Sequence, residues 1–532
     1  MAAKAYRTYV LILLMIIYAV NFLDRQVVTI IAPYLKADLG VSDAQIGLLF
    51  GTAFALFYAV FGLPLAKLAD GWNRVRTISI GLFFWSSMTA VSGFTSTFAQ
   101  LGAARVGVGV GEASASPASY SLLQDYFPKS VRATVLALYS AGIYLGSGAA
   151  LIFGGAVIQY WEAHYTPATA PLGLTGWQAT YLAFGVPGIV LAILMWLTVR
   201  EPVRGAIDGL PTPGDPKPLQ SVMGEFAAML PPWNWRGFQR LDATGQTLRR
   251  NAVLLALVCL AAMVIITGTD SLLAPAKRAA VGQLGDFVIT TNMVQWAALA
   301  IGVYCVGSWV QTIRLRDPAS YALMANPGFI GLTIAGGLMS YISYGLSPFL
   351  FLYAKQQFGV GAESGLTLGL ITAIGGGLGA TFGGIFGDWL RRSHAGGRMI
   401  VMLIAAIGSA VTIYASYAVT SLNAFYAFAA INIFIHIMWL GPCAATVQDL
   451  VLPRMRGTAT AVFFLGTTIL GLGLGPYLTG LVSDVTGDLR IALMSTMVVV
   501  PLILVAIVTA LRTVPGLERN LLDRARAAGE TV

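Results

Sequence analysis

Residues 124–134 read QDYFPKSVRAT, and residues 448–458 read QDLVLPRMRGT. The glutamine, aspartate, arginine and threonine of the two stretches coincide at a constant offset of 324 residues, which also relates Gly142 to Gly466. A second pair of segments, AKLAD at residues 66–70 and GIFGD at residues 384–388, ends in aspartate with arginines following. The chain is therefore predicted to contain two related halves that follow one another in the same order.

Each half is built from long apolar segments. The chain has 532 residues, of which 57% are hydrophobic and 10% charged, whereas soluble domains carry about 25% charged residues. About 20 mostly apolar residues cross a bilayer as a helix. We therefore predict an all-α membrane protein with two pseudo-symmetric six-helix bundles. The predicted spans are 8–35, 43–69, 75–97, 99–126, 131–160 and 176–199 in the first half, and 325–353, 363–390, 398–418, 422–450, 456–482 and 489–512 in the second.

Two further apolar segments, 252–268 and 286–312, lie between the halves. They form either an extra transmembrane hairpin or a pair of interfacial helices. Arginines flank both outer ends, as a hairpin with two cytoplasmic ends requires, so the hairpin is favoured. The predicted domains are a bundle at 1–200, a cytoplasmic linker with the hairpin at 201–320, a second bundle at 321–515 and a cytoplasmic tail at 516–532.

Basic residues gather in the loops of one side of the membrane. Because cytoplasmic loops carry an excess of Lys and Arg, this asymmetry places both termini in the cytoplasm of a multi-pass protein, which we expect in the cell inner membrane. The net charge of +9 then reflects topology rather than nucleic-acid binding. The basic residues on this side include Lys4, Arg7, Arg74, Arg76, Lys129, Arg132, Arg200, Arg204, Arg391, Arg392, Arg398, Arg454, Arg456, Arg519, Arg524 and Arg526.

The two aspartate-ending segments lie on this basic side and are candidates for a conformational gate. An aspartate there can cap a neighbouring helix and pair with a nearby arginine. Such a bond stabilises one conformation and must break in another. The predicted gate residues are Asp70 with Arg74, and Asp388 with Arg391 or Arg392.

Four charged residues fall inside predicted spans, where a charge costs at least about 2.5–3.5 kcal/mol on insertion scales. Asp24 and Arg25 lie in span 1, and Arg105 and Glu112 lie seven residues apart in span 4, on one helix face. They form either a structural ion-pair network or a site for substrate and protons. An apolar surrounding favours a protonated carboxyl and a nearby arginine favours an ionised one. A movement of the arginine would therefore load or empty the acid.

Other features carry weaker signals. His436 is either a packed, hydrogen-bonded histidine or a functional one, and Tyr58 and Tyr144 are possible cavity residues. The three cysteines, Cys259, Cys305 and Cys443, fit no metal motif, so no metal or cofactor is expected. Glycines 109 and 111 lack the preceding strand of a dinucleotide loop, and no nucleophile–base pair is evident.

The residues around spans 1 and 4 resemble the spinster branch of the major facilitator superfamily. Residues 21–25, NFLDR, resemble an Asn-Tyr-x-Asp-Arg motif of helix 1, and residues 109–114, GVGEAS, match a motif of helix 4 with Arg105 upstream. Residues 70–74, DGWNR, are similar to Asp-Arg-Tyr-Asn-Arg, except that Gly71 replaces the first arginine. The specific match covers mainly residues 20–155, and the extra hairpin departs from the usual pattern.

The resemblance implies proton-linked transport of lysolipids or sphingoid lipids, with Asp24 and Glu112 in proton coupling and Arg25 and Arg105 in contact with the headgroup. The predicted function is thus a secondary transporter that works by alternating access as a monomer among membrane lipids. Efflux of drugs or other small organic solutes fits as well. The alternatives of another class are a lipid-modifying membrane enzyme, which would need a nucleophile or metal site, and a sensor, which would bind without flux.

Overall fold

The chain is described here by a computed structural model that covers residues 2–128, 131–166, 168–208, 215–242, 245–275, 278–452 and 455–530; side chains are not described at 2, 3, 70 and 133. It divides into two compact units that are not the two halves of the sequence. The first unit holds residues 1–41, 53–226 and 348–373, and the second holds residues 42–52, 227–347 and 374–532.

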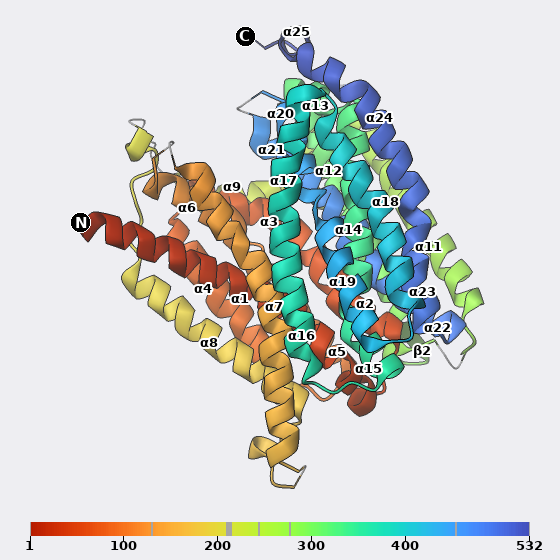
Figure 1. Cartoon of the computed structure of the whole chain (residues 1–532). Coiled ribbons are helices and arrows are strands. Elements are labelled where there is room, and N and C mark those ends of the chain that lie inside the picture. The colour runs from red at the N-terminus through yellow and green to blue at the C-terminus, as the bar shows by residue number, and fades with distance from the viewer. Residues whose placement is uncertain are drawn as a thin grey trace. The chain divides into compact units, whose positions relative to one another are not determined.

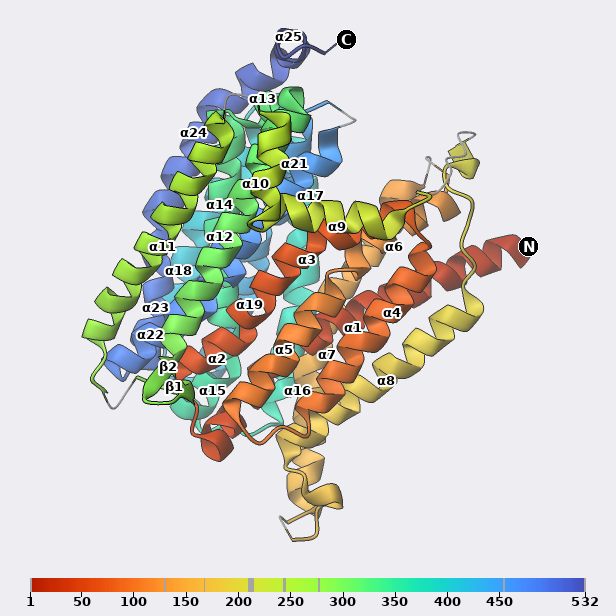
Figure 2. The same cartoon turned by 180° about the vertical axis from the view of Figure 1, so that it is seen from behind.

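The first unit is helical and takes most of its helices from the N-terminal half. Its helices are α1 (Ala2–Leu39), α3 (Thr52–Gly71), α4 (Arg74–Ser92), α5 (Phe98–Glu112), α6 (Ala115–Tyr126), α7 (Arg132–His164), α8 (Gly176–Thr198), α15 (Leu350–Phe358) and α16 (Ser364–Leu370), with α9 (Pro218–Met229) at its boundary. Figures 1 and 2 show α1, α4, α7 and α8 side by side.

The second unit takes its helices mainly from the C-terminal half. They are α2 (Asp43–Phe50), α10 (Trp233–Leu241), α11 (Gln246–Leu272), α12 (Thr291–Arg316), α13 (Pro318–Met324), α14 (Pro327–Leu346), α17 (Gly376–Ser393), α18 (Gly397–Ala418), α19 (Leu422–Ile437), α20 (Leu440–Asp449), α21 (Arg456–Thr467), α22 (Gly475–Thr486), α23 (Leu489–Ser495), α24 (Val500–Arg519) and α25 (Leu521–Ala527).

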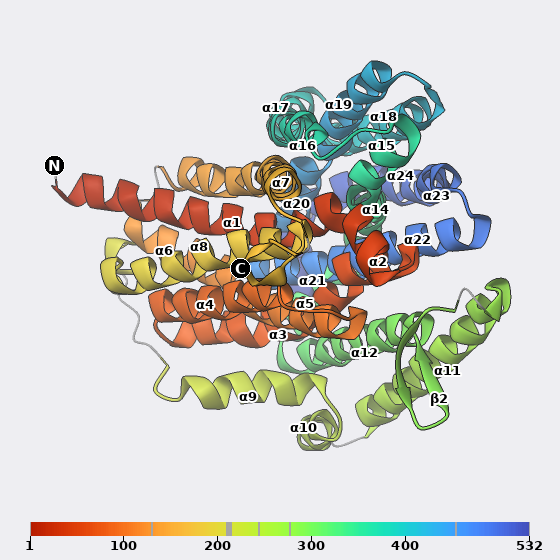
Figure 3. The ribbon, with the colours of Figure 1, turned by 90° about the horizontal axis from the view of Figure 1, so that it is seen from below.

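The two segments between the halves form an antiparallel helix pair, α11 and α12, that lies at one edge of its unit (Figure 3). A short β-hairpin of β1 (Ala280–Leu284) and β2 (Phe287–Thr290) joins them. The second helix therefore begins at Thr291 and not at residue 286, as the sequence had suggested. Thr290 caps it, because its hydroxyl accepts a hydrogen bond from Met293 N at 3.2 Å.

Twelve helical segments of the described chain are long and apolar enough to cross a membrane. They include α11 and α12, whereas the predicted spans 3 and 4 correspond to α4 and to the pair α5–α6 and fall outside this measure. Span 4 is interrupted at residues 113–114, and its first part is a 15-residue helix with two charges. The predicted all-α membrane fold is confirmed, and the chain is a multi-pass membrane protein.

Glycines bring helix backbones into contact in the first unit. A Cβ at Gly146 of α7 would lie 2.0 Å from the carbonyl oxygen of Ala19 in α1, and one at Gly142 would lie 2.8 Å from the carbonyl oxygen of Met15. Small residues at helix crossings are the usual means of close association in membranes, where lipid is as apolar as the side chains. The α1–α7 contact therefore fixes the position of α1, which carries two of the charged residues.

Replacing Gly146 by Ala should destabilise the protein by roughly 1–3 kcal/mol, because the added methyl group overlaps backbone atoms that cannot rotate away. The measurement is the thermal unfolding midpoint of the purified protein in detergent. Gly62→Ala in α3 is the matched control, since nothing lies within 4 Å of a Cβ there. Equal midpoints for the two variants would contradict the tight α1–α7 contact.

Candidate functional site

The four predicted intramembrane charges lie together in the first unit. Asp24 and Arg25 come from α1, and Arg105 and Glu112 come from α5. All four side chains are buried, with Asp24, Arg105 and Glu112 fully inaccessible. The two acids and two arginines therefore lie close together, as expected. The two arginines have different bonding partners.

Arg25 forms an ion pair with Glu112. Its Nη2 lies 2.9 Å from Glu112 Oε2. The guanidinium also faces three aromatic rings, with its Cζ 4.2 Å from the centre of Phe54, 4.7 Å from Phe22 and 5.3 Å from Tyr58. Cation–π contacts strengthen when the cation is removed from water, so these rings stabilise Arg25 within an apolar bundle. Tyr58 was expected to line a cavity, and the structure places it beside this arginine.

Arg105 binds backbone instead of a carboxylate. Its Nη1 donates to the carbonyl oxygen of Asp24 at 2.8 Å, and its Nη2 donates to that of Arg25 at 3.5 Å. The guanidinium therefore fixes the chain of α1 at the position from which both charged side chains project. This contact makes Arg105 a positioning residue for the pair in addition to its electrostatic effect on Asp24.

The Asp24 carboxylate has a different environment from that of Glu112. Within the described chain neither of its oxygens accepts a hydrogen bond of ordinary geometry. The Trp85 indole and the Thr89 hydroxyl of α4 are buried next to it and act on it as hydrogen-bond donors. These two α4 residues were not predicted, because nothing in the sequence marks a single Trp and Thr in an apolar helix as facing the acid.

The remaining cavity candidates do not join this cluster. Tyr144 lies half-buried in α7. His436 belongs to α19 in the other unit, where its Nδ1 lies 2.9 Å from Ser409 Oγ and its Nε2 lies 3.1 Å from the carbonyl oxygen of Met339. Both ring nitrogens are thus hydrogen-bonded within a buried core, which favours the packed interpretation of this histidine. The described residues contain no group of three or more His, Cys, Asp or Glu placed to hold a metal ion.

The predicted gate arginine of the first half, Arg74, is buried, and each of its three guanidinium nitrogens donates a hydrogen bond. Its Nε donates to Glu201 Oε1 at 2.7 Å, and its Nη1 lies 2.5 Å from Asp125 Oδ2. The same guanidinium donates to the backbone and hydroxyl of Ser121 and to the backbone of Pro202. The side chain of Asp70, the partner proposed from the sequence, lies outside the described side chains.

In the second half, the arginine bonded to Asp388 is Arg398. Its Nη2 lies 2.7 Å from Asp388 Oδ1, and its Nη1 lies 2.7 Å from Asp449 Oδ2. The predicted pairing of Asp388 with Arg391 or Arg392 is therefore wrong among the described residues: Arg391 pairs with Asp449 and Glu518, and Arg392 is exposed. Arg391 still interacts with Asp388 electrostatically, without an ion-pair contact between them.

The repeat contained the signal that identifies these partners. The offset of 324 residues that relates Asp125 to Asp449 also relates Arg74 to Arg398, and both pairs are bonded in the same way. Each half therefore carries an arginine–aspartate pair between equivalent helices. Both arginines are thus bonded to the aspartate of the longer repeat, at residues 125 and 449.

Gly71 makes contact with the linker that follows α8. Its carbonyl oxygen accepts a hydrogen bond from Asp215 N at 2.9 Å, and a Cβ at position 71 would lie 2.7 Å from Asp215 Cβ. Arg204 donates to the carbonyl oxygens of Ala69 and Trp72. A hydrogen bond from Ser221 lowers the pKa of the exposed Asp215 carboxyl. The linker thus occupies the space in which an arginine side chain at position 71 would begin.

Comparisons with known proteins agree with this fold. The family model described as Major Facilitator Superfamily matches residues 14–325, more than half of the chain. The chain belongs to the major facilitator superfamily. It is a transporter of this class and not an enzyme, as predicted, and the alternative of a lipid-modifying enzyme does not hold.

More specific relatives include spinster proteins. The chain is 29% identical to human protein spinster homolog 1 over 351 residues, which are 62% of this chain and 57% of that protein. It is 24% identical to an MFS-type efflux pump of Mycolicibacterium smegmatis over 90% of this chain and 84% of the pump. A crystal structure of a bacterial homolog of the human lysosomal transporter spinster, inward-facing and unoccupied, aligns with a TM-score of 0.66 and 23% identity over 98% of both chains. The resemblance to the spinster branch is confirmed.

Replacing Arg74 by Met should lower the free energy of unfolding by about 3–5 kcal/mol, because Asp125 and Glu201 would be left as unpaired, partly buried carboxylates. Arg76→Met is the control at an exposed arginine two residues away. The measurement is the midpoint of thermal unfolding of the purified protein in detergent at pH 7, without added denaturant. A midpoint equal to that of the control would show that the Arg74 network contributes nothing to stability.

Proposed function

We propose that the chain is a proton-coupled secondary transporter that moves an amphipathic or lipid-like substrate by alternating access. We place it in the cell inner membrane as a monomer with both termini cytoplasmic. The observation that carries the proposal is the buried Arg25–Glu112 ion pair, set among aromatic rings in the same unit as a second fully buried acid, Asp24.

The ion pair provides a chemical means of coupling. While Glu112 is ionised, it holds Arg25 at 2.9 Å, and the arginine is unavailable to a substrate. Protonation of Glu112 removes the attraction and leaves a buried guanidinium that needs another anion. A substrate with an anionic headgroup then becomes the favoured partner, because an arginine binds phosphate and carboxylate through two parallel hydrogen bonds. Proton and substrate binding are thereby linked at one residue.

Asp24 supplies the second acid. A fully buried carboxylate is costly when ionised, so a change in the surroundings of Asp24 would bind or release a proton there. Arg105 binds the backbone next to Asp24 at 2.8 Å. A displacement of α5 relative to α1 would therefore change the environment of both acids at once. We assign proton coupling to Asp24 and Glu112, with Arg25 and Arg105 as their charge partners.

The substrate class follows from the surroundings of Arg25. Three aromatic rings lie within 5.3 Å of a single cation. Sites of this kind suit a molecule with an apolar body and one anionic group. A lysophospholipid or sphingoid lipid has this character, in keeping with the similarity to spinster proteins.

Efflux of drugs or other small organic solutes is the alternative. The similarity to the mycobacterial efflux pump extends over 90% of this chain, and apolar aromatic surroundings also suit amphipathic drugs. Binding screens separate the two. Lysophospholipids, sphingoid lipids and cationic drugs are titrated against the purified protein at several pH values, and intrinsic tryptophan fluorescence reports binding.

The arginine–aspartate pairs at Arg74 and Arg398 are the proposed conformational gates. Each guanidinium is held by an aspartate from another helix of its own unit, and Arg74 also by Glu201 in the segment after α8. A rearrangement that separates those helices must break the pair. The gate would then contribute to the free-energy difference between the two conformations that alternating access requires.

Replacing Glu112 by Gln should abolish proton-driven accumulation, because an amide cannot release a proton and does not attract Arg25 as a carboxylate does. The protein is reconstituted in liposomes with an imposed pH gradient, and uptake of the tightest ligand of the screen is measured. Exchange of that ligand without a gradient should persist, since exchange needs no proton cycle. Glu162→Gln, at an exposed position of α7, is the control. Accumulation against a gradient by Glu112→Gln would refute the coupling.

A further inference from the structure

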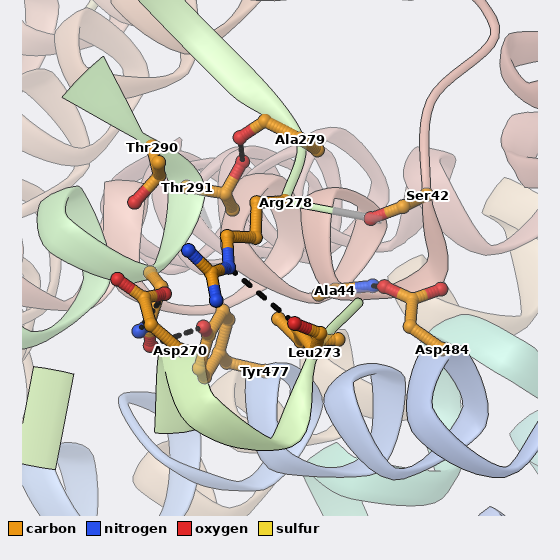
Figure 4. Close-up of a pocket in the computed structure, with 11 residues that line it drawn as sticks. Ser42, Ala44, Asp270, Leu273, Arg278, Ala279, Thr290, Thr291, Tyr477 and Asp484 are labelled. Carbon is orange, nitrogen blue, oxygen red and sulfur yellow. Dashed lines mark hydrogen bonds between the residues drawn. The ribbon is translucent and has the colours of Figure 1, made fainter. Parts of the chain in front are cut away.

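The hairpin of α11 and α12 has no part in the proposed transport mechanism, yet it contacts one particular helix pair. That pair is α2 and α22, which lie antiparallel in the second unit, so that α2 begins where α22 ends. With both termini cytoplasmic, as proposed, the start of α2 faces the outer side of the membrane. Figure 4 shows residues of α11, α12, α22 and the start of α2 around one small cavity.

The α2–α22 contact is a direct approach of two backbones. A Cβ at Gly47 would lie 2.3 Å from the carbonyl oxygen of Pro476, and one at Gly480 would lie 2.2 Å from that of Asp43. Asp484 of α22 caps α2, because its two carboxylate oxygens accept hydrogen bonds from Asp43 N at 3.0 Å and Ala44 N at 2.9 Å. This contact is therefore a closed one that excludes water and substrate.

One backbone carbonyl group just before α22 accepts hydrogen bonds both from the residue after α2 and from the hairpin helix α12. Helical geometry is irregular at residues 468–472, and α22 begins only at Gly475. The carbonyl oxygen of Gly473 accepts a hydrogen bond from Thr52 Oγ1 at 2.8 Å and another from Gln295 Nε2 of α12 at 2.8 Å. Thr52 follows α2 directly, so the start of span 2 and the hairpin bind the same atom.

Asn292 joins the two hairpin helices to α22. Its Oδ1 accepts hydrogen bonds from Tyr477 of α22 and from Thr269 of α11, both at 2.9 Å. Its Nδ2 donates to Asp270 Oδ1 of α11 at 2.7 Å. The amide is buried, so each lost bond leaves a polar group without water as a substitute.

The hairpin also reaches α2 itself. Gln45 of α2 donates through Nε2 to the carbonyl oxygen of Ala280 in β1 at 3.4 Å. The cavity of Figure 4, whose lining includes Asp270, Asn292 and Asp484, measures about 10 Å³, which is about the room of a single water molecule. It is too small for a substrate, so its polar lining serves the contact between the helices and not a ligand.

We propose that the hairpin holds α2 against α22 and so sets how readily the outer end opens. The inference rests on the proposed alternating access, in which α2 and α22 separate when the substrate path opens outward. The hairpin contacts both helices, through Asn292 and Gln295 on one side and Ala280 on the other. It therefore stabilises the closed arrangement and is strained or released when that arrangement opens.

The test follows the accessibility of a cysteine placed in the contact. Ala44 is buried at the start of α2, and Ala44→Cys is introduced together with Cys259→Ser, which removes the exposed natural cysteine. The rate of reaction with a membrane-impermeant maleimide is measured in proteoliposomes. Tyr477→Phe and Gln295→Met each delete one hydrogen bond and conserve the side-chain volume, so each should raise the rate roughly three- to tenfold.

Tyr304→Phe is the matched control. Tyr304 of α12 also donates from a buried hydroxyl to an asparagine, Asn251 Oδ1 at 2.7 Å, but this asparagine belongs to α11, so the bond lies within the hairpin. Its reaction rate should equal that of the parent. Rates for Tyr477→Phe and Gln295→Met equal to that of Tyr304→Phe would refute the role of the hairpin while leaving alternating access intact. A reporter that never reacts in any folded variant would refute the opening of α2 from α22, and with it both proposals.

Discussion

A guanidinium inside an apolar helix bundle must find its counter-charge and its hydrogen-bond acceptors in the protein, since neither lipid nor bulk water supplies them. Three buried arginines of the first unit meet this demand in three ways. Arg74 is surrounded by two carboxylates and several backbone or hydroxyl oxygens, Arg105 binds backbone carbonyls, and Arg25 combines one carboxylate with aromatic faces. The helices that carry these partners are thereby fixed in position, and the rest of the unit is arranged around them.

The three solutions differ in how easily they can change. All three guanidinium nitrogens of Arg74 donate hydrogen bonds, so its network favours one arrangement strongly. The pair of Arg25 with Glu112 depends on one charge that a proton can remove, and the aromatic faces remain when that charge is gone. An arrangement held by a titratable bond can serve as a switch, whereas one held by many permanent bonds serves as a support. In the proposed mechanism, the titratable pair belongs to the transport site, and the Arg74 network is a gate that opens only when several bonds break together.

Much of the fold could be predicted because its causes are periodic and compositional. Long apolar segments, loop arginines and the offset of 324 residues identified the bundles and the equivalence of Asp125 and Asp449. The clustering of Asp24, Arg25, Arg105 and Glu112 followed from the cost of charge in a membrane. The ion-pair partners of the charged residues were harder to predict, because they depend on the direction in which side chains of different helices point. The sequence neighbours of Asp388 suggested Arg391 or Arg392, but Arg398 reaches it from the next helix. No feature of the sequence indicated that Trp85 and Thr89 lie beside Asp24.

The contact between Gly71 and Asp215 makes two distant positions depend on each other. A side chain at residue 71 would start 2.7 Å from Asp215 Cβ, so its effect depends on where the linker lies. Substitutions at the two sites should therefore be non-additive, as is usual for residues in direct contact. Restoring the arginine of the related motif in this chain would report on displacement of the linker as much as on the loop itself. In the language of genetics, the two positions are epistatic, and transferring the motif between relatives requires transferring the linker with it.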